Sequence, residues 1–180
     1  MSAAARALGL AVLLGLSGAH LGCGYALVGK GVTTDASIKK IGVPLFHDAT
    51  GKTGLDLRVT QRVIEELLKR GRFDVLQQAN DVDAVVEGEL LSYVVVPVGF
   101  SDEGGTLAQP NRYSVTLTAR IKYTKPGATE PIWQNDAFSF RDEYDVSSDP
   151  GAFFNQEDQA LDRLSQQFAR SLVAAMLEAF

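Results

Sequence analysis

The segment from Arg112 to Lys125 alternates polar and apolar side chains without a break. A period of two is typical of a β-strand in an antiparallel sheet that has one buried and one solvated face. The apolar face holds Tyr113, Val115, Leu117, Ala119, Ile121 and Tyr123. The polar face holds Arg112, Ser114, Thr116, Thr118, Arg120, Lys122 and Thr124. The chain must therefore form a sheet and cover one face of it.

Further strand patterns lie on both sides of this segment. They run from Ile38 to Phe46, Phe73 to Leu76, Asp83 to Val98 and Ile132 to Arg141. In the third of them the alternation slips at Leu90–Leu91, which indicates a β-bulge or a fully buried stretch. Turn-rich residues separate the strands at His47 to Gly54, in a glycine-rich hairpin loop from Ser101 to Pro110, and at Lys125-Pro126-Gly127.

Two segments carry helical periodicity. The first begins near Leu55, where Thr53 and Asp56 resemble a capping box, and it ends at Gly71. Its apolar face consists of Leu55, Val59, Val63, Ile64, Leu67 and Leu68. The second lies near the C-terminus, with apolar residues Leu161, Leu164, Phe168, Leu172, Met176 and Leu177. These patterns predict an α+β fold: a mainly antiparallel sheet of about four strands, with two helices packed on one face.

The N-terminus has the pattern of an export signal. Arg6 precedes an apolar run, Ala7 to Leu16, which is too short to span a bilayer; a buried N-terminal helix is the alternative reading. The run leads to Gly22-Cys23-Gly24, which resembles a lipobox. We therefore predict a signal peptide over 1–22, an acylated Cys23 that carries diacylglycerol and palmitate-type chains, a tether over 23–37 and one domain over 38–180. Gly24 stands where an aspartate would resemble an inner-membrane retention signal, so the pattern favours the outer membrane.

Candidate catalytic residues are few. His47 lies next to Asp48, and Glu87 and Glu89 share one side of a strand, but no nucleophile motif accompanies either pair. Cys23 is the only cysteine, so the chain lacks the clustered ligands of a zinc site. We predict no catalytic site, no metal and no cofactor, although a pocket lined jointly by Glu87, Glu89 and His47 would favour an enzyme.

The polar face of the alternating strand is the best candidate for binding. Arg112, Arg120, Lys122 and the nearby Lys125 can contact phosphates or partner carboxylates, whereas a merely solvated face is the alternative. The same strand also has the character of an edge for strand addition. The formal net charge of −5 argues against nucleic acid as a partner.

The mature chain as a whole resembles the LptE family of lipopolysaccharide-assembly lipoproteins. The pieces that match are Gly22-Cys23-Gly24-Tyr25, Ile41-Gly42-Val43-Pro44-Leu45-Phe46, Ala49-Thr50-Gly51, Gly54-Leu55, Val63-Ile64-Glu65-Glu66-Leu67-Leu68, Asp83-Ala84-Val85-Val86-Glu87-Gly88-Glu89-Leu90, Tyr113-Ser114-Val115 and Ile132-Trp133. The lipobox departs from the usual pattern at His20 and Leu21.

This resemblance implies a lipid-anchored protein on the periplasmic face of the outer membrane, which plugs the LptD β-barrel translocon, supports its assembly and binds lipopolysaccharide during delivery to the cell surface. The family fold it implies is a helix-covered four-stranded sheet. Arg112, Arg120, Lys122 and Lys125 are predicted lipid contacts from the argument about the strand face alone. Two alternatives remain: a generic scaffold lipoprotein of another envelope machine, and an envelope enzyme.

Overall fold

The computed structural model describes residues 35, 37–101, 109–146 and 150–178, which all belong to one compact unit, Val32–Phe180. Cys23 and the predicted signal peptide lie outside the described residues, as does the middle of the loop predicted from Ser101 to Pro110. The elements, in chain order, are β1 (Lys40–Gly42), β2 (His47–Asp48), α2 (Leu55–Lys69), β3 (Asp74–Leu76), β4 (Ala84–Ser101), β5 (Gln109–Thr124), β6 (Trp133–Asp145) and α3 (Pro150–Glu178).

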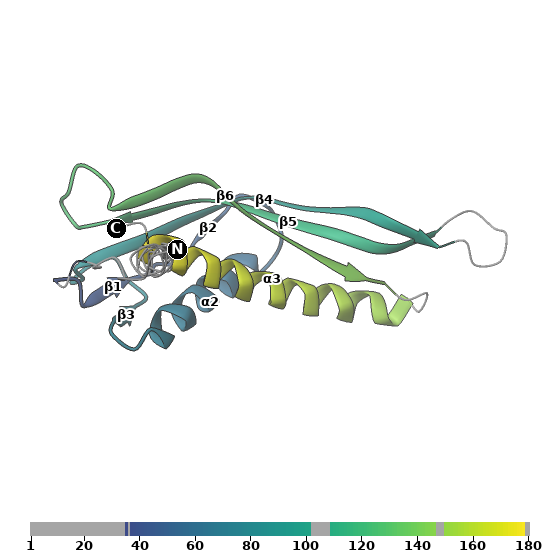
Figure 1. Ribbon diagram of the computed structural model, residues 1–180, viewed down its shortest axis with the longest axis horizontal. Coiled ribbons are helices and arrows are strands. Elements are labelled where there is room, and N and C mark those ends of the chain that lie inside the picture. The colour runs from purple at the N-terminus through teal and green to yellow at the C-terminus, as the bar shows by residue number, and fades with distance from the viewer. Residues whose placement is uncertain (1–34, 36, 102–108, 147–149, 179–180) are drawn as a thin grey trace, which may run out of the picture. The chain divides into compact units, whose positions relative to one another are not determined.

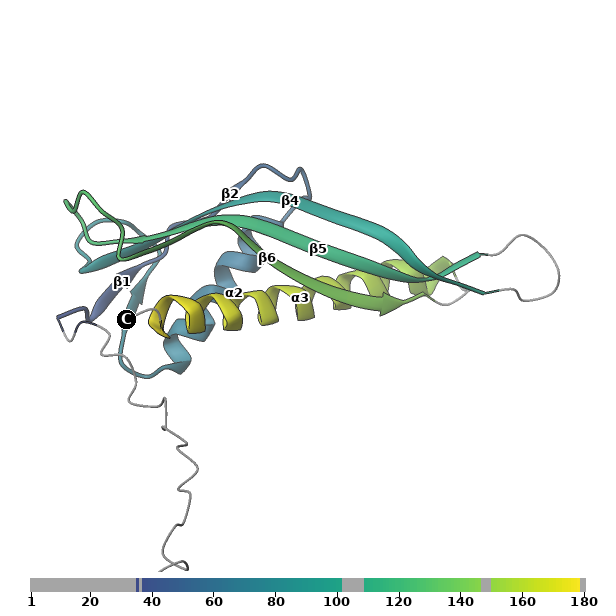
Figure 2. The same ribbon diagram turned by 45° about the horizontal axis from the view of Figure 1, so that its top comes forward.

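The described strands form one mixed sheet of six strands in the order β3-β1-β4-β5-β6, with β2 also paired to β4. Both helices cover the same face of this sheet (Figures 1 and 2). The α+β class is therefore confirmed, but a mainly antiparallel sheet of about four strands is wrong. β1 pairs in parallel with β3 and β4, and β2 pairs in parallel with β4. The parallel pairing of β1 with β3 follows because α2 connects the first strands to β3 as a crossover helix.

The strand predicted from Ile38 to Phe46 is broken in the middle. Pro44 has no N–H to donate to a sheet ladder, and the Phe46 N–H donates to Thr60 Oγ1 of α2 at 3.0 Å. The chain rejoins the sheet at β2, where His47 pairs with Glu89. The prediction of a turn at His47 and Asp48 is therefore wrong.

Helix α2 buries the predicted face, with the exception of Leu68, whose side chain is 51% exposed. The predicted capping box is also wrong. Gly54 is the N-cap residue in a left-handed conformation, and no side chain donates or accepts a cap hydrogen bond there. Gly71 has φ 69°, which confirms its role as the C-terminal stop because glycine adopts this conformation without steric cost.

Strand β4 contains the predicted bulge. Its pairing with β5 shifts register between Leu90 and Ser92. Before the shift, Ala84, Val86 and Leu90 are fully buried beneath the helices. Beyond it the phase of burial is reversed, so that Val94 and Val96 point to the opposite face.

Strand β5 forms the centre of the core. Its apolar face is fully buried from Val115 to Tyr123, as predicted, and the apolar positions of α3 from Leu161 to Leu177 pack beneath it. One position on the polar face differs from the prediction: Ser114 is only 2% exposed.

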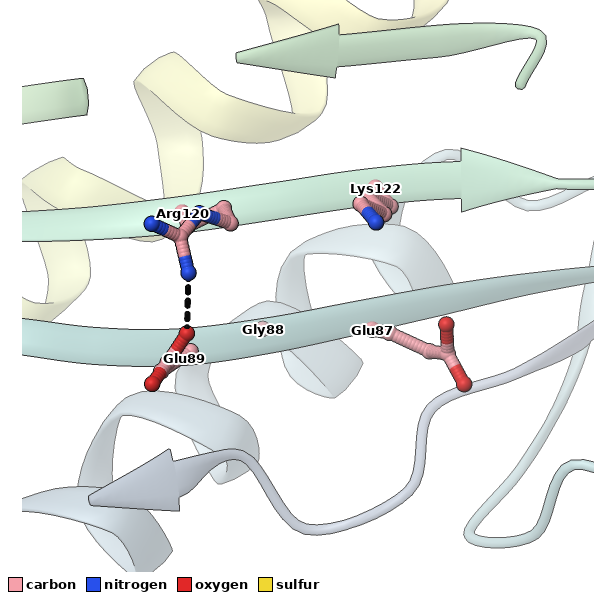
Figure 3. A pocket seen from close by; sticks show the side chains of 5 residues that line it. All are labelled: Glu87, Gly88, Glu89, Arg120 and Lys122. Atoms are coloured by element: carbon pink, nitrogen blue, oxygen red, sulfur yellow. Dashed lines mark hydrogen bonds and ion pairs between the residues drawn. The ribbon is translucent and has the colours of Figure 1, made fainter. Parts of the chain in front are cut away.

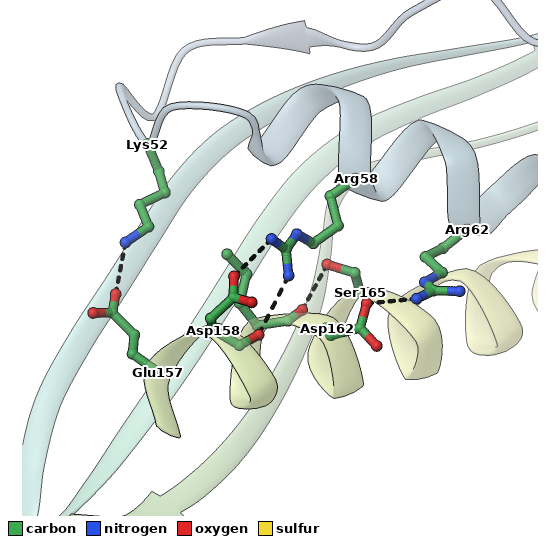
Figure 4. Close-up of polar contacts among 8 residues, drawn as sticks. Lys52, Arg58, Arg62, Glu157, Asp158, Asp162 and Ser165 are labelled. Atoms are coloured by element: carbon green, nitrogen blue, oxygen red, sulfur yellow. Dashed lines mark hydrogen bonds and ion pairs between the residues drawn. The ribbon is translucent and has the colours of Figure 1, made fainter. Parts of the chain in front are cut away.

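The two helices are also joined by ion pairs (Figure 4). Arg58 pairs with Asp158 at 2.7 Å, and Arg62 pairs with Asp162 at 2.6 Å. Lys52, in the loop before α2, pairs with Glu157 at 2.6 Å. All three cations precede or lie in α2 and all three carboxylates lie in α3, so the ion pairs favour this alignment of α3 along α2. Within the described residues, neither helix is long and apolar enough to cross a membrane.

Candidate functional site

The face of the sheet that the helices leave open carries a shallow hollow of about 220 Å³. It is lined by Glu87, Gly88, Glu89, Arg120 and Lys122 (Figure 3). The register of β4 and β5 assembles it, because Glu89 lies opposite Arg120 and Glu87 lies opposite Lys122. Side chains at paired positions point to the same side of a sheet, so two cations and two carboxylates share one patch.

Arg120 is the most strongly engaged of these groups. Its guanidinium donates to Glu89 at 2.6 Å and also lies 3.6 Å from Asp136 of β6. Its side chain is nevertheless 44% exposed, so an incoming anion can reach it from solvent. Exposed ion pairs of this kind contribute little free energy. The exchange of one carboxylate for another anion therefore costs little free energy.

Lys122 and Glu87 are different. Among the described residues, neither side chain has a hydrogen bond or an ion pair, and both are exposed. Lys122 is therefore the cation of this hollow that is most available to a phosphate, because no carboxylate must be displaced from it first.

The other two predicted lipid contacts lie apart from the hollow. Arg112 is eight residues from Arg120 along β5, which corresponds to about 26 Å. Its Nε donates to Asp145 at 2.7 Å, and this hydrogen bond raises the pKa of Arg112. Lys125 donates to Asp35, which holds the pKa of that carboxyl far below its ordinary value. The structure thus brings together Arg120 and Lys122 but not all four cations.

The hollow is not a purely cationic patch. Glu87, Glu89 and Asp136 face Arg120 and Lys122, so carboxylates outnumber cations there. Sequence reasoning placed the two glutamates on one side of their strand, but it did not place that side next to Arg120. Only the strand register supplies this information.

The candidate catalytic groups do not line one pocket together. His47 is exposed on β2 and does not line the hollow. Asp48 accepts hydrogen bonds from the N–H and the hydroxyl of Thr50, as in a local turn. No group of three or more histidine, cysteine or acidic residues in the described part of the chain is placed to hold a metal ion.

A second exposed feature of β4 was not predicted. Val94, Val96, Val98 and Phe100 of β4 are each more than 40% exposed. The sequence contains a signal for it, because residues 90–101 include no charged side chain. A strand without charged side chains is also compatible with full burial, so the pattern alone did not predict that these residues are exposed.

Comparison with known proteins places this fold in a family. The family model described as "LptE: Lipopolysaccharide-assembly" matches residues 38–176. No curated protein was found to match. Among solved structures, the hypothetical protein CT253 from Chlamydia trachomatis has a TM-score of 0.51 at 11% identity, covering 79% of this chain and 99% of that chain.

Two further solved structures were found. Protein XCC0632 from Xanthomonas campestris has a TM-score of 0.51 at 12% identity, covering 78% of this chain and 85% of its own. A minor lipoprotein from Acinetobacter baumannii has a TM-score of 0.48 at 16% identity, covering 79% and 92%. The two structures with a TM-score of 0.51 support the fold alone, whereas the family model spans most of the chain. The chain belongs to the LptE family of lipopolysaccharide-assembly lipoproteins.

Proposed function

We propose that this protein is an outer-membrane lipoprotein which binds lipopolysaccharide, plugs the LptD β-barrel translocon and supports its assembly. The match of the LptE family model to residues 38–176 carries this proposal. The protein acts by binding and not by catalysis, and Cys23 anchors it to the membrane so that the domain from residue 38 faces the periplasm.

Lipopolysaccharide carries phosphates on its lipid portion, and an acidic protein must contact them through a local group of cations. Lys122 and Arg120 are two residues apart on β5, which places their side chains on the same side at about 6–7 Å along the strand. Lys122 receives the first phosphate because it has no carboxylate partner among the described residues. Arg120 exchanges Glu89 or Asp136 for a second anionic group. Arg112 and Lys125 extend the contact at the two ends of the strand.

Replacement of both central cations tests the lipid contact. Arg120→Glu with Lys122→Glu is expected to weaken lipopolysaccharide binding by about tenfold or more, because two charge-assisted bonds become repulsions. The measurement is a binding titration of the purified full-length protein at low and moderate salt, with circular dichroism to verify folding. The effect shrinks as salt rises, since the patch is exposed.

A control variant makes the same change in net charge on the helix side. Lys69→Glu with Arg170→Glu alters two exposed cations that lie on α2 and α3. It is expected to bind lipopolysaccharide like the unmodified protein. Equal binding by the folded Arg120/Lys122 variant would mean that this part of the sheet is only a solvated surface.

Isolation of the protein from envelope membranes after chemical crosslinking tests the barrel partner. We expect a large β-barrel protein to be recovered with it. A generic scaffold lipoprotein is the second candidate, and recovery of a different envelope complex without such a barrel would favour it.

A further inference from the structure

One stretch of β4 is exposed although it is almost entirely apolar. The twelve residues from Leu90 to Ser101 contain no charge. Val94, Val96 and Val98 are 49%, 45% and 42% exposed, and Phe100 is 58% exposed. We call these four residues the apolar stripe. Contiguous exposed apolar side chains on a folded domain generally mark a contact surface.

The first two residues of the apolar stripe, Val94 and Val96, continue the face that carries the hollow. Val94 lies opposite Thr116 and Val96 lies opposite Ser114. These partners alternate along β5 with the same phase as Arg120 and Lys122, so all of them point to the side of the sheet away from the helices. The register shift between Leu90 and Ser92 produces this arrangement, because without it Val94 and Val96 would point into the core.

A strand or a second copy of the chain fits this surface poorly. In the described structure, β1 and β2 pair with β4 only up to Leu90. Beyond Leu90, the edge of β4 opposite β5 has no neighbouring strand. Pro97 and two further register shifts near Gly99 interrupt a regular ladder there. Four side chains also fall far short of the roughly 800 Å² that each partner buries in a stable protein interface.

The dimensions and the charge pattern suit a lipid. From Val94 to Phe100 the strand covers about 20 Å, which exceeds the roughly 15 Å thickness of one leaflet of a bilayer core. The cationic end of the same face begins at Arg120, four residues along β5 from the partner of Val94. A charged patch followed by an apolar stripe is complementary to an amphiphile that has a phosphorylated headgroup and extended acyl chains.

We infer that the apolar stripe binds the acyl chains of the lipopolysaccharide whose phosphates contact Lys122 and Arg120. This inference rests on the proposed function and assigns a second subsite to it. The headgroup is held by charge, and the chains lie along Val94, Val96, Val98 and Phe100 and shield them from water.

Threonine substitutions test the stripe with little disturbance of the fold. Val94→Thr with Val96→Thr keeps the branched shape and the preference for strands but adds a hydroxyl to each side chain. The purified full-length protein is titrated with intact lipopolysaccharide and with lipopolysaccharide from which all acyl chains have been removed. We expect the unmodified protein to prefer the intact lipid, and the double variant to bind the intact lipid about tenfold more weakly with unchanged binding of the deacylated form.

A matched control is available on α2. Leu57 and Leu68 are 65% and 51% exposed, and they lie on the helix that covers the other face. Leu57→Gln with Leu68→Gln removes exposed apolar surface of similar extent and is expected to leave the preference for intact lipid unchanged. Equal loss of binding in this control would show a nonspecific dependence on apolar surface and would overturn the inference.

A fluorescent reporter makes the test independent of small changes in stability. In the variant Phe100→Trp the new indole lies on the stripe. Beyond any change that Trp133 shows in the unmodified protein, intact lipopolysaccharide is expected to shift the emission to shorter wavelength, while the deacylated form leaves it unchanged. Equal binding of both lipids by the unmodified protein, or no shift of emission in the Phe100→Trp variant, would overturn the inference and leave the proposed function in place. Failure of the unmodified protein to bind either form would instead contradict the proposed function.

Discussion

Gly88 allows a buried side chain to pack directly against the backbone of β4. A Cβ at this position would lie 2.4 Å from Cδ2 of the Phe46 ring, and that side chain is almost fully buried. The ring therefore packs directly on the backbone of β4, underneath the hollow that Gly88 lines on the other side. A glycine between Glu87 and Glu89 is required by this close approach rather than by an unusual backbone angle.

Gly88→Ala is expected to lower the free energy of unfolding by about 1–3 kcal/mol, because the buried ring must move away from the added methyl group. Urea titration measures the change. A double-mutant cycle with Phe46→Leu provides the control: in that background the alanine should cost less, since the shorter side chain frees the space. A cost below about 0.5 kcal/mol in the otherwise unmodified protein would contradict the close contact.

Asp83 holds the start of β1 next to β4. Its Oδ2 accepts hydrogen bonds from the backbone N–H groups of Lys40 and Lys39, each at 2.8 Å. These bonds stabilise the ionised carboxylate and lower its pKa below the usual 3.8. The stabilisation is therefore fully present above the pKa of the unfolded chain, and it is lost as pH falls through the lower pKa of the folded state.

Asp83→Asn is accordingly expected to be less stable than the unmodified protein at pH 7, and this difference should shrink below about pH 4. Thermal unfolding at a series of pH values measures it. Asp81→Asn is the matched control, because Asp81 is exposed and has φ 59°, a conformation that asparagine tolerates. A stability difference that stays constant down to about pH 2 would rule out a role for the ionised carboxylate of Asp83.

At the scale of elements, the periodicity of α2 identified the buried face of the helix but not which residues lie at the border of that face. Leu67 is fully buried and Leu68 is 51% exposed, although both belong to the predicted apolar face. The ion pairs between α2 and α3 favour one alignment of the two helices. Exposed pairs of this type contribute at most about 1 kcal/mol each. Apolar burial therefore dominates the docking of α2.

The two adjacent leucines provide a direct comparison. Leu67→Ala is expected to reduce the free energy of unfolding by about 2–5 kcal/mol, because it leaves a cavity in the core. Leu68→Ala should change it by less than about 0.5 kcal/mol, since alanine retains the helix propensity and the site is half exposed. Denaturant titration of both variants checks the pair, and similar losses would mean that the helix face has been assigned incorrectly.

At the scale of the whole molecule, the proposed function depends on the proposed anchor at Cys23, a residue outside the described part of the chain. Cys23 follows Gly22 at the end of an apolar run, and it is the only cysteine of the chain. Multiple acyl chains on one residue hold a protein on a membrane, because each buried methylene contributes about 0.8 kcal/mol.

Cys23→Ala is expected to abolish incorporation of labelled fatty acid and to remove the protein from the membrane fraction. Fractionation after labelling with radioactive palmitate measures both effects in one experiment. The Arg120/Lys122 variant serves as the control, because its Cys23 is intact and it should remain acylated. Persistent acylation of the Cys23→Ala protein would refute this anchor.

The sequence by itself determined the elements in which burial is periodic. The alternation from Tyr113 to Tyr123 and the apolar positions of both helices correctly assigned most of the core, because the water-exposed side of a strand or helix must be polar over several turns or pleats. It also located the irregularity at Leu90–Leu91, for which a bulge and a fully buried stretch were both open, and, through the order of short motifs, it identified the LptE family.

The tertiary structure alone decided the relations between elements. Parallel pairing of β1 with β3 depends on the crossover through α2, which no local pattern records. The carboxylates beside Arg120 come from β4 and β6, so strand register determines whether this cation is free or paired. The bulge likewise exchanges the buried and exposed faces of β4, a strand that has no charged residue beyond Leu90. Only the structure therefore shows that Val94 and Val96 point to solvent and not to the core.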